Sequence, residues 1–472
     1  MSDAVCFWSA WELTAAMRAG TISAREVLAA HLEQTARANP HVNAIVTLVE
    51  DRARAAAHAA DERHARREPL GPLHGLPVAH KDTHLTAGIR TTFGSPLLAD
   101  NVPAEDELVI ERLIGAGAIT TGKTNVPEFA AGSHTVNPVF GATLNPYDRT
   151  RSAGGSSGGA AAAVACGMVP IADGSDMGGS LRNPAAFCNV VGLRPSPGRV
   201  PSYPVPMAWS TLSVQGPIAR SVGDVALALS ALAGSDPRSP IAIPEPASVF
   251  AGSLDRDMRG LRVAWSPDLG GALPVEHAVL DALKAVPAVF DHLGAVVEEA
   301  CPDLHSAEEV LRTLRAWHFA QAYGPLAERS PEQLNANITW NVEQGRRLSG
   351  ADLARAEVLH TALFHRVRAF FERFDVLILP VTQVLPFDAA IDHPTEIAGV
   401  TQETYLDWMR SCYWISATGS PALSVPAAFT PDGLPVGLQI VGRHRGDLDV
   451  LQLGNAFEQA TGVGRRRPPV GG

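Results

Sequence analysis

Short apolar segments alternate along the chain with longer segments in which apolar and polar residues repeat at helical spacing. The apolar runs interrupt the helical pattern and are short, so they predict buried strands. The predicted strands cover residues 42–48, 76–80, 118–120, 169–171, 261–265, 376–379, 422–425 and 438–441. Strands that alternate with helices in this way indicate the α/β class, with a layered sheet.

A long helical pattern covers residues 303–372, inside a segment (300–415) that is rich in aromatic side chains. The aromatic residues there are Trp317, Phe319, Tyr323, Trp340, Tyr405, Trp408, Tyr413 and Trp414. Two interpretations stay open. These side chains either pack the helices against one another or form an apolar wall over a binding site for a bulky group.

The composition is typical of a soluble globular protein, because 46% of the residues are hydrophobic and 18% are charged. The formal net charge of −11 disfavours nucleic acid or an anionic membrane as a partner. No apolar stretch is long enough to span a bilayer, and a signal-peptide pattern is absent. Five scattered cysteines suit a reducing compartment. We therefore expect a cytoplasmic enzyme without nucleic-acid or membrane partners, and a homo-oligomer stays open.

Lysine is scarce in this chain, since only three of its 38 basic residues are lysines: Lys81, Lys123 and Lys284. Arginine keeps its proton in proteins, whereas a desolvated lysine can lose it and act as a base. Each lysine therefore marks a position where arginine chemistry could fail. Lys284 lies in an ordinary helical pattern, which predicts a surface position.

Residues 117–124 match the P-loop pattern GxxxxGK[ST] around Lys123. A P-loop follows a strand and precedes a helix. Here a helical pattern precedes Gly117, the segment itself reads as a strand, and Pro127 follows soon after. We therefore disfavour a P-loop nucleotide-binding protein and expect a structural role for Lys123.

Three histidines, His74, His80 and His84, form a cluster in which two have a spacing that suits zinc on a helix. The strand pattern around Pro77 argues against a helix at that point, and no HExxH glutamate is present. We expect surface or supporting histidines, with no metal site and no cofactor.

Two loops rich in glycine and serine carry the strongest chemical signal, at residues 152–159 and 173–180. Small residues allow several backbone N–H groups to point at one spot and form an oxyanion hole. A serine at the end of such a turn can attack a carbonyl carbon held there. Neither loop contains a histidine, but a neutral lysine acting through a second serine would supply the base.

These loops and their neighbours resemble the amidase signature family. The matching segments are 75–82, 122–125, 128–129, 154–159, 174–182, 184–187, 191–195, 419–422 and 433–442. The resemblance is strong over 70–230 and 415–460. It implies an α/β/α layered fold with a large twisted mixed sheet covered by helices on both faces. It also implies a single amidase domain over 1–472, with a signature core at 70–230 and a variable helical segment at about 300–415 covering the substrate site.

The resemblance assigns a Ser–cisSer–Lys unit to this chain. Ser180 corresponds to the nucleophile, Ser156 to the bridging serine and Lys81 to the base, with a cis peptide bond between Gly155 and Ser156. The implied oxyanion hole consists of the N–H groups of Met177, Gly178, Gly179 and Ser180. The implied supporting residues are Gly155, Ser157, Asp176 and Arg182. Met177 departs from the commonest family residues, so its side chain is expected to alter the local packing.

The implied reaction is hydrolysis of a carboxylic amide, anilide, ester or carbamate to an acid and an amine (or alcohol) through an acyl-enzyme. For Lys81 to act as a base, burial or nearby positive charge must lower its pKa to near 7. Candidate substrate-binding residues are Ala130, Trp209, Trp317 and Trp414. The family alternative is the amidase subunit of a glutamine-dependent tRNA amidotransferase, which would need partner subunits.

Overall fold

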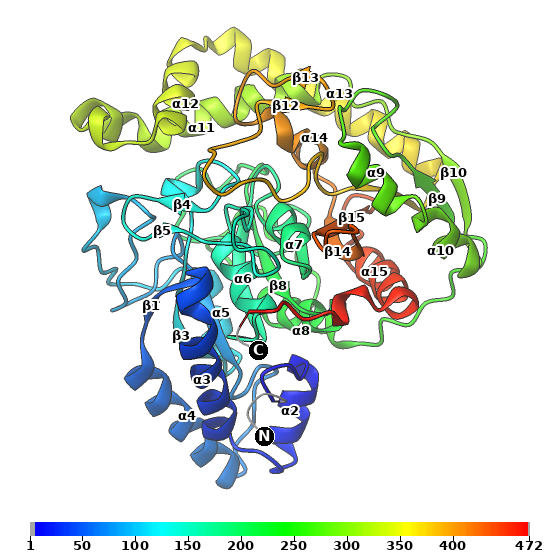
Figure 1. The fold of residues 1–472 in the computed structure, drawn as a ribbon. Coiled ribbons are helices and arrows are strands. Elements are labelled where there is room, and N and C mark those ends of the chain that lie inside the picture. The colour runs from blue at the N-terminus through cyan, green and yellow to red at the C-terminus, as the bar shows by residue number, and fades with distance from the viewer. Residues whose placement is uncertain (1–4, 471–472) are drawn as a thin grey trace.

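One sheet of eleven strands runs through the molecule, a computed structural model that describes residues 5–470 (Figure 1). In spatial order its strands are β1 (Ile45–Leu48), β3 (Ile119–Thr124), β2 (Pro77–Lys81), β6 (Ile171–Asp176), β8 (Val214–Ala219), β7 (Val191–Arg194), β14 (Ala422–Phe429), β15 (Pro435–Val441), β11 (Val376–Pro380), β9 (Arg262–Trp265) and β10 (Val296–Glu299). Two small hairpins pair β4 (Val136–Asn137) with β5 (Gly141–Ala142) and β12 (Glu396–Ile397) with β13 (Val400–Thr401).

The sheet is mixed, as the resemblance implies. At one edge β1 is antiparallel to β3, and the next strands, β3, β2 and β6, are parallel to one another. At the other edge β11, β9 and β10 are parallel. Between these ends, the neighbours from β6 through β8, β7, β14 and β15 to β11 are antiparallel. The predicted strand at 42–48 begins later, at Ile45, because residues before it complete a helix.

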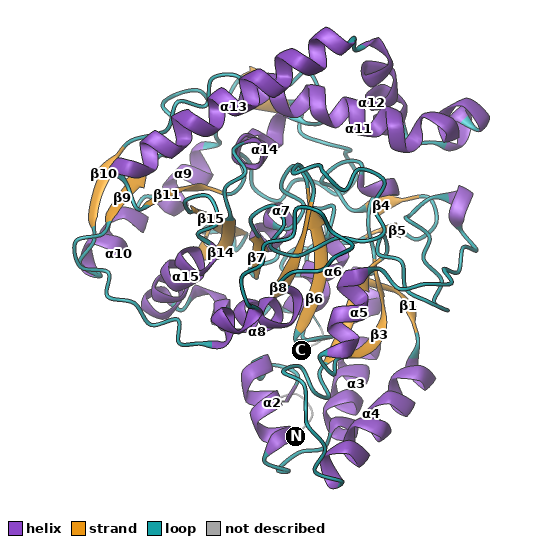
Figure 2. Cartoon of the chain, turned by 180° about the vertical axis from the view of Figure 1, so that it is seen from behind, coloured by secondary structure: helices purple, strands orange, loops and turns teal. Residues whose placement is uncertain are grey.

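Helices surround the sheet (Figure 2). They are α2 (Ala10–Arg18), α3 (Ala24–Val42), α4 (Glu50–Ala65), α5 (Leu108–Gly115), α6 (Gly158–Ala165), α7 (Arg182–Phe187), α8 (Val222–Leu232), α9 (His277–Leu283), α10 (Val286–His292), α11 (Ala307–Arg329), α12 (Ala336–Arg347), α13 (Gly350–Arg373), α14 (Arg410–Ala417) and α15 (Asp447–Thr461). Short 3-10 turns are η1 (Pro96–Leu98), η2 (Glu128–Ala130), η3 (Ala247–Ala251), η4 (Pro331–Gln333), η5 (Asp407–Met409) and η6 (Val463–Arg465).

The central strands have helices on both faces. A Cβ added to Gly437 of β15 would lie 2.6 Å from Ala186 of α7, and one added to Gly454 of α15 would lie 2.4 Å from Leu423 of β14. Gly437 pairs with Pro426 of β14, and side chains alternate between the faces of a strand, so Pro426 and Leu423 point to opposite faces. Helices α7 and α15 therefore cover opposite faces, as expected for the layered fold.

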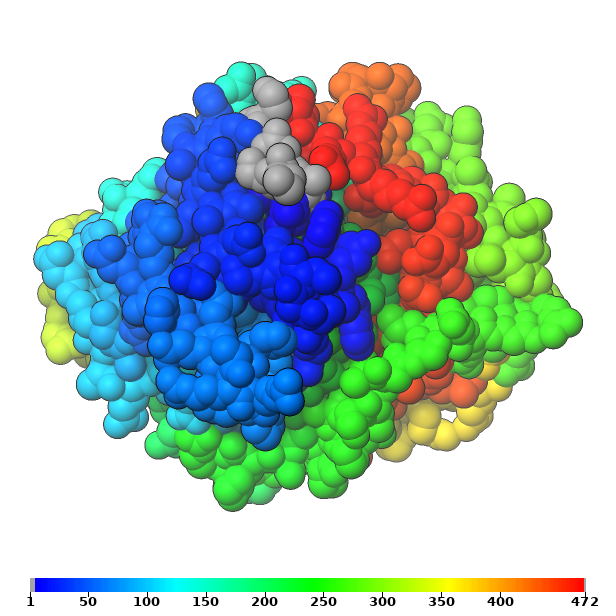
Figure 3. Space-filling view, turned by 90° about the horizontal axis from the view of Figure 1, so that it is seen from below, coloured from blue at the N-terminus to red at the C-terminus, as the bar shows by residue number. Residues whose placement is uncertain are grey.

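The helical pattern at 303–372 forms three helices, α11, α12 and α13, which lie together at the top of Figure 1. At the opposite side, residues near the two ends of the chain meet on one face (Figure 3). There the guanidinium of Arg467 lies 4.0 Å from the centre of the Phe7 ring. The sheet between these two regions carries the candidate active site.

Candidate active site

Lys81 is the last residue of β2, and its side chain is completely buried. Its Nζ lies 2.8 Å from Ser156 Oγ, 3.0 Å from Ser175 Oγ and 3.5 Å from the carbonyl oxygen of Ser175. All three contacts are neutral oxygens, so no carboxylate contacts the ammonium directly. This environment gives little to offset the cost of burying a charge.

Burial lowers the pKa of Lys81 to about 7, against the opposing charges of Asp176 and Asp173. The predicted fall in pKa is thus present, and desolvation is its cause. Nearby positive charge, the other cause considered, does not contribute. A substantial fraction of Lys81 is neutral near pH 7, as a general base requires.

Ser156 lies in the first Gly/Ser loop, just before α6, and the Gly155–Ser156 peptide bond is cis, as predicted. Polar side chains hold this loop from outside. Ser133 donates its hydroxyl hydrogen to the Gly155 carbonyl, and Thr135 Oγ1 lies 2.8 Å from the Gly154 carbonyl oxygen. Ser156 is thereby fixed with its hydroxyl oxygen against Lys81 Nζ.

Ser180 is half-buried and follows the second Gly/Ser loop. Its carbonyl oxygen accepts the N–H of Ser157 at 3.2 Å, which ties the two loops together. Across residues 5–470 its hydroxyl has no hydrogen-bond partner, so the structure does not join Ser156 Oγ to Ser180 Oγ. Catalytic hydrogen bonds are often long without substrate and shorten when substrate binds.

The second loop is shorter than predicted, because residues 171–176 belong to β6 and only 177–180 form the turn. The N–H groups of Met177, Gly178 and Ser180 have no acceptor in the described part of the chain. The N–H of Gly179 instead donates to Asp176 Oδ1 at 2.8 Å. Of the four N–H groups expected to form an oxyanion hole, three are therefore free to donate to a ligand.

Gly179 shapes this turn through its backbone conformation. Its φ is +116°, a region that favours glycine, and an added Cβ would lie 2.6 Å from Asn183 Nδ2 and 2.7 Å from Cys412 Cβ. A side chain at this position would disrupt the turn that contains the three free N–H groups.

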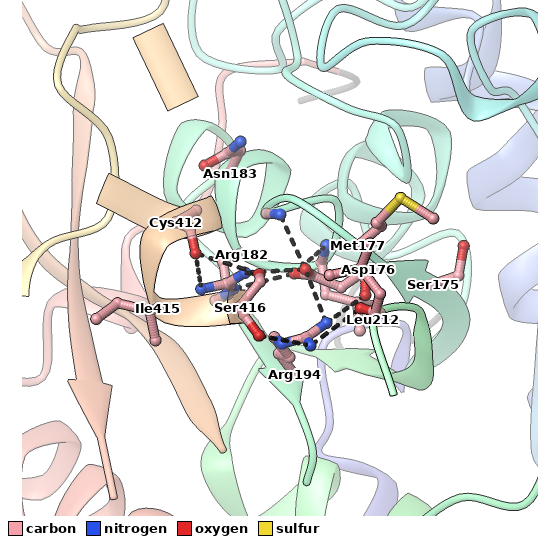
Figure 4. Close-up of polar contacts among 12 residues, drawn as sticks. Ser175, Asp176, Met177, Arg182, Asn183, Arg194, Leu212, Cys412, Ile415 and Ser416 are labelled. Carbon is pink, nitrogen blue, oxygen red and sulfur yellow. Dashed lines mark hydrogen bonds and ion pairs between the residues drawn. The ribbon is translucent and has the colours of Figure 1, made fainter. Parts of the chain in front are cut away.

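Asp176 and Arg182, two predicted supporting residues, form a buried ion-pair network with Arg194 (Figure 4). Arg182 Nη2 lies 2.9 Å from Asp176 Oδ1, and Arg182 Nη1 reaches the carbonyl oxygen of Cys412 in α14 at 2.9 Å. Although burial alone would raise the pKa of Asp176, the two guanidinium groups hold it well below its usual range. The network clamps the oxyanion turn against α14.

Arg315 of α11 holds the side chain of Met177. Arg315 Nη1 lies 3.2 Å from Met177 Sδ, and its Nη2 lies 2.9 Å from the hydroxyl of Tyr405. The guanidinium also lies 4.3 Å from the centre of the Phe319 ring. The Met177 side chain therefore packs against the helical segment through Arg315.

The three histidines are buried rather than exposed, and His80 and His84 support the segment around Lys81. Nδ1 of His80 contacts Asp173 Oδ2, and Nδ1 of His84 lies 2.8 Å from Asp173 Oδ1. Asp173 also accepts the backbone N–H of Lys81 at 2.8 Å. Burial alone would raise the pKa of Asp173, but the two histidines lower it far below its usual range. Within residues 5–470, no group of three or more histidine, cysteine, aspartate or glutamate side chains is arranged to hold a metal ion.

Lys123 lies inside β3, so the P-loop interpretation is wrong: its lysine does not begin a helix. The buried Nζ donates to the His84 carbonyl and lies 2.7 Å from Thr86 Oγ1. Burial lowers the pKa of Lys123 to about 8, although the negative charges of nearby carboxylates, chiefly Asp82, act to raise it. Lys123 holds the turn after β2, and Lys284 is exposed at the end of α9.

A cavity of about 390 Å³ adjoins the second Gly/Ser loop and is lined by Ser175 and Met177, but not by Lys81, Ser156 or Ser180. Apolar walls come from aromatic and aliphatic side chains that include Phe93, Val200, Phe319 and Tyr323. Its polar lining includes Ser175, His84, Glu107 and Gln215. We did not predict these four residues as site residues. For Ser175 the signal was present, since it lies inside the matched segment 174–182.

The four predicted substrate-binding residues lie outside this cavity. Ala130 is half-buried in η2, Trp209 is 78% exposed, and Trp317 is 38% exposed, while its neighbour Phe319 lines the cavity. Trp414 packs against the hydrophobic core and donates its indole N–H to Glu308 at 2.7 Å. Of the aromatic segment, Phe319 and Tyr323 form walls, whereas Tyr405, Trp408 and Tyr413 are buried in the core.

Known proteins share this architecture. Residues 26–451 match the family model described as Amidase. The chain is 36% identical over 472 residues to an acylamidase from Rhodococcus erythropolis, covering 99% of this chain and 98% of that one. It is 35% identical over 485 residues to a subunit of glutamyl-tRNA(Gln) amidotransferase from Synechococcus sp. (strain CC9605), covering 98% and 97%. The crystal structure of a bacterial aryl acylamidase of the amidase signature family matches with TM-score 0.91 and 30% identity, covering 98% and 99%.

The chain therefore belongs to the amidase signature family and is an amide-hydrolysing enzyme. Within residues 5–470, the helices are all too short or too polar to cross a bilayer.

Proposed function

We propose that this enzyme hydrolyses a carboxylic amide through an acyl-enzyme on Ser180, with Ser156 as the proton bridge and Lys81 as the base. The observation that carries the proposal is the contact of a buried lysine with Ser156 Oγ at 2.8 Å. Burial lowers the pKa of this lysine to about 7, so it can accept a proton at neutral pH.

In the proposed reaction, Ser180 Oγ attacks the amide carbonyl carbon while its proton passes to Ser156 Oγ, whose own proton passes to Lys81 Nζ. The N–H groups of Met177, Gly178 and Ser180 stabilise the oxyanion. The C–N bond breaks as the proton returns through Ser156 to the leaving nitrogen. Water then attacks the ester carbon as its proton passes through Ser156 to Lys81. The bond between that carbon and Ser180 Oγ breaks as the proton returns through Ser156 to Ser180 Oγ, which releases the acid.

The walls of the cavity favour amides with a bulky apolar or aryl part, including anilides, and related esters or carbamates. Phe93, Phe319 and Tyr323 contribute aromatic surface there. The likeness to an acylamidase and to an aryl acylamidase supports this substrate class. We also propose that residues 1–472 act as a single domain whose segment 300–415 covers the substrate.

A second candidate is the amidase subunit of a glutamine-dependent amidotransferase, which is supported by the likeness to several such subunits. That role needs partner subunits, whereas an independent amidase works alone. The two roles are separated by the hydrolytic activity of the purified chain alone, measured on anilides, aryl esters, carbamates, primary amides and glutamine.

The test uses wild type and Ser180→Ala on this panel, with mass spectrometry of the quenched enzyme. We expect turnover of anilides by the wild-type chain alone, an acyl adduct on Ser180, and neither in the variant. Hydrolysis of glutamine only, and only with added subunits, would favour the second candidate. An active Ser180→Ala protein would overturn the proposed nucleophile.

A further inference from the structure

One carboxylate, that of Asp173, holds three points of the segment that carries Lys81. Asp173 Oδ1 accepts the backbone N–H of Lys81 at 2.8 Å and lies 2.8 Å from Nδ1 of His84. Asp173 Oδ2 contacts Nδ1 of His80. Nδ1 can carry a hydrogen in the neutral and in the charged imidazole, so both ring contacts suit a carboxylate in either case. A single side chain thereby fixes residues 80, 81 and 84 relative to β6.

These contacts lie where two strands of the sheet separate. Strand β2 pairs with β3 as far as Lys81, but its pairing with β6 ends earlier, at Ala79 and Ala172. The N–H of Lys81 donates to the Asp173 side chain and not to a backbone carbonyl of β6. The carboxylate therefore takes the place of a bond of the sheet ladder, at the residue that carries the amine.

The amine at the other end of Lys81 is held by serines. Its Nζ lies 2.8 Å from Ser156 Oγ and 3.0 Å from Ser175 Oγ. Ser175 is only two residues after Asp173 in β6. One strand thus contacts Lys81 at both ends, through Asp173 at the backbone and through Ser175 at the amine.

A buried carboxylate is a costly way to join two strands. Asp173 is 1% exposed, and a buried charge often stabilises a fold no better than an apolar side chain of similar size. Although burial alone would raise the pKa of Asp173, His80 and His84 hold it far below its usual range, so the group stays ionised. The charge and its three contacts therefore indicate a role beyond packing.

We propose that Asp173 is the positioning residue of the base, and that its carboxylate fixes the backbone of Lys81 so that Nζ lies against Ser156. This role rests on the proposed amidase function, to which it adds a residue outside the relay. Asp173 acts through Lys81, and none of its contacts is with a reacting atom of the proposed relay.

The charge of Asp173 supplies a readout that packing would not. Its negative charge, like that of Asp176, opposes the fall in the pKa of Lys81. Loss of this charge should favour the neutral amine, so the pH at which kcat/KM is half-maximal should fall. The other titratable groups around Lys81 and Asp173 stay in place: His80, Asp82, His84, Glu107 and Lys123.

The test compares Asp173→Asn and Asp173→Ala with wild type on an anilide. Asparagine keeps an oxygen for the N–H of Lys81, whereas alanine leaves that N–H without an acceptor. A misplacement of about 1 Å costs about a hundredfold in rate. We expect the plateau kcat to fall about a hundredfold in Asp173→Ala and about tenfold in Asp173→Asn, with KM nearly unchanged.

The pH profile of the same variants completes the test. The half-maximal pH should fall by at least about half a unit in both, because each removes the same charge. A wild-type kcat in Asp173→Ala, or a half-maximal pH that stays in place, would overturn the positioning role.

Asp447→Asn provides the matched control. Asp447 is also buried, accepts the N–H of Ser196 at 2.7 Å and pairs with Arg199. Ser196 follows β7, which is three strands away from β2. Asp447→Asn should therefore keep the wild-type kcat and half-maximal pH. An equal loss of kcat in Asp447→Asn and Asp173→Asn would contradict a specific role for Asp173.

Two measurements are independent of turnover. In wild type labelled with ¹⁵N-lysine, the backbone amide of Lys81 should exchange its hydrogen at least about a hundredfold more slowly than that of the exposed Lys284. Rapid exchange at Lys81 would overturn the hold even if no Asp173 variant folds. The side chain of Lys81 should also titrate at a lower pH in Asp173→Asn than in wild type. Both results would stand if wild type hydrolyses no amide, an outcome that refutes the amidase function alone.

Discussion

Two buried lysines lie on neighbouring strands of the sheet, Lys81 on β2 and Lys123 on β3. Burial lowers the pKa of both, to about 7 for Lys81 and about 8 for Lys123. Their contacts differ in kind. Lys81 touches two serine hydroxyls, one of them on the cis loop, whereas Lys123 binds a carbonyl oxygen and a threonine hydroxyl beside Asp82.

If Lys81 and not Lys123 is the base, as proposed, desolvation alone does not make a catalytic base. A neutral lysine becomes useful where its nitrogen meets a hydroxyl that can pass a proton onward to a nucleophile beside oxyanion donors. In the proposed mechanism, Lys81 meets Ser156 in such a place. The hydroxyl bonded to Lys123 belongs to Thr86, which is fully buried. Four changes test this difference, and they are arranged from the largest expected effect.

The largest effect is expected for Lys81→Arg. Arginine keeps a positive charge but cannot release its proton, so the relay has no base. We expect kcat/KM on an anilide to fall by about a thousandfold or more. Lys284→Arg, the same substitution at an exposed site, serves as the control and should retain wild-type activity. An Lys81→Arg enzyme within tenfold of wild type would refute the relay.

The pH profile should report Lys81 and not Lys123. Because the neutral amine is the active form and burial lowers the pKa of Lys81 to about 7, kcat/KM should rise with pH and level off above about 7. Below that point we expect about tenfold loss per pH unit, hence about a hundredfold at pH 5. A profile that is flat between pH 5 and 7 in a folded enzyme would contradict the assignment.

Matched hydroxyl deletions come next. Ser175→Ala removes one of the two hydroxyls on Lys81, and Thr86→Val removes the hydroxyl on Lys123. For Ser175→Ala we expect kcat/KM to be about tenfold lower, because Lys81 loses an orienting partner. We also expect a shift in the acid limb, the part of the pH profile in which kcat/KM falls as the pH is lowered. Thr86→Val should leave the acid limb in place, measured in parallel on the same substrate. An equal shift of the acid limb in both variants would contradict the proposed difference between Lys81 and Lys123.

The smallest effect concerns stability. Lys123→Met leaves the His84 carbonyl and Thr86 Oγ1 without their donor and removes the positive charge near Asp82, so unfolding free energy should fall by about 1–3 kcal/mol. Lys81→Met removes a poorly compensated amine and should change it little or raise it. Urea unfolding at pH 7 measures both. A greater loss of stability in Lys81→Met than in Lys123→Met would reverse the comparison.

Much of the site could be predicted because its signals are local in sequence. The scarcity of lysine pointed to Lys81, the glycine-rich segments pointed to Ser156, Ser157 and Ser180, and the family resemblance selected Ser156 as the bridging serine. The occupied N–H of Gly179 was not visible, because it depends on how the Asp176 carboxylate turns back onto its own loop.

The unpredicted parts depend on contacts between distant segments. His84, Glu107 and Gln215 come from the loop after β2, the start of α5 and strand β8, and only the sheet brings them together. Strands β7 and β8 also escaped prediction. Gly192 and Gly216 interrupt the apolar pattern of these strands. Glycine is needed at both positions because a Cβ would lie 2.4 Å from a backbone oxygen at Gly192 and 2.3 Å from one at Gly216.

The central claim is that Lys81 is neutral near pH 7 in the folded enzyme, and the scarcity of lysine makes a direct measurement practical. Labelling with ¹³C-lysine gives three side-chain signals, which Lys123→Met and Lys284→Arg assign. An NMR titration should show the Lys81 Cε signal shifting with a midpoint at about 7, because burial lowers the pKa of Lys81 to that value. A Lys81 signal that titrates only near the ordinary lysine pKa of 10.5 would contradict the account.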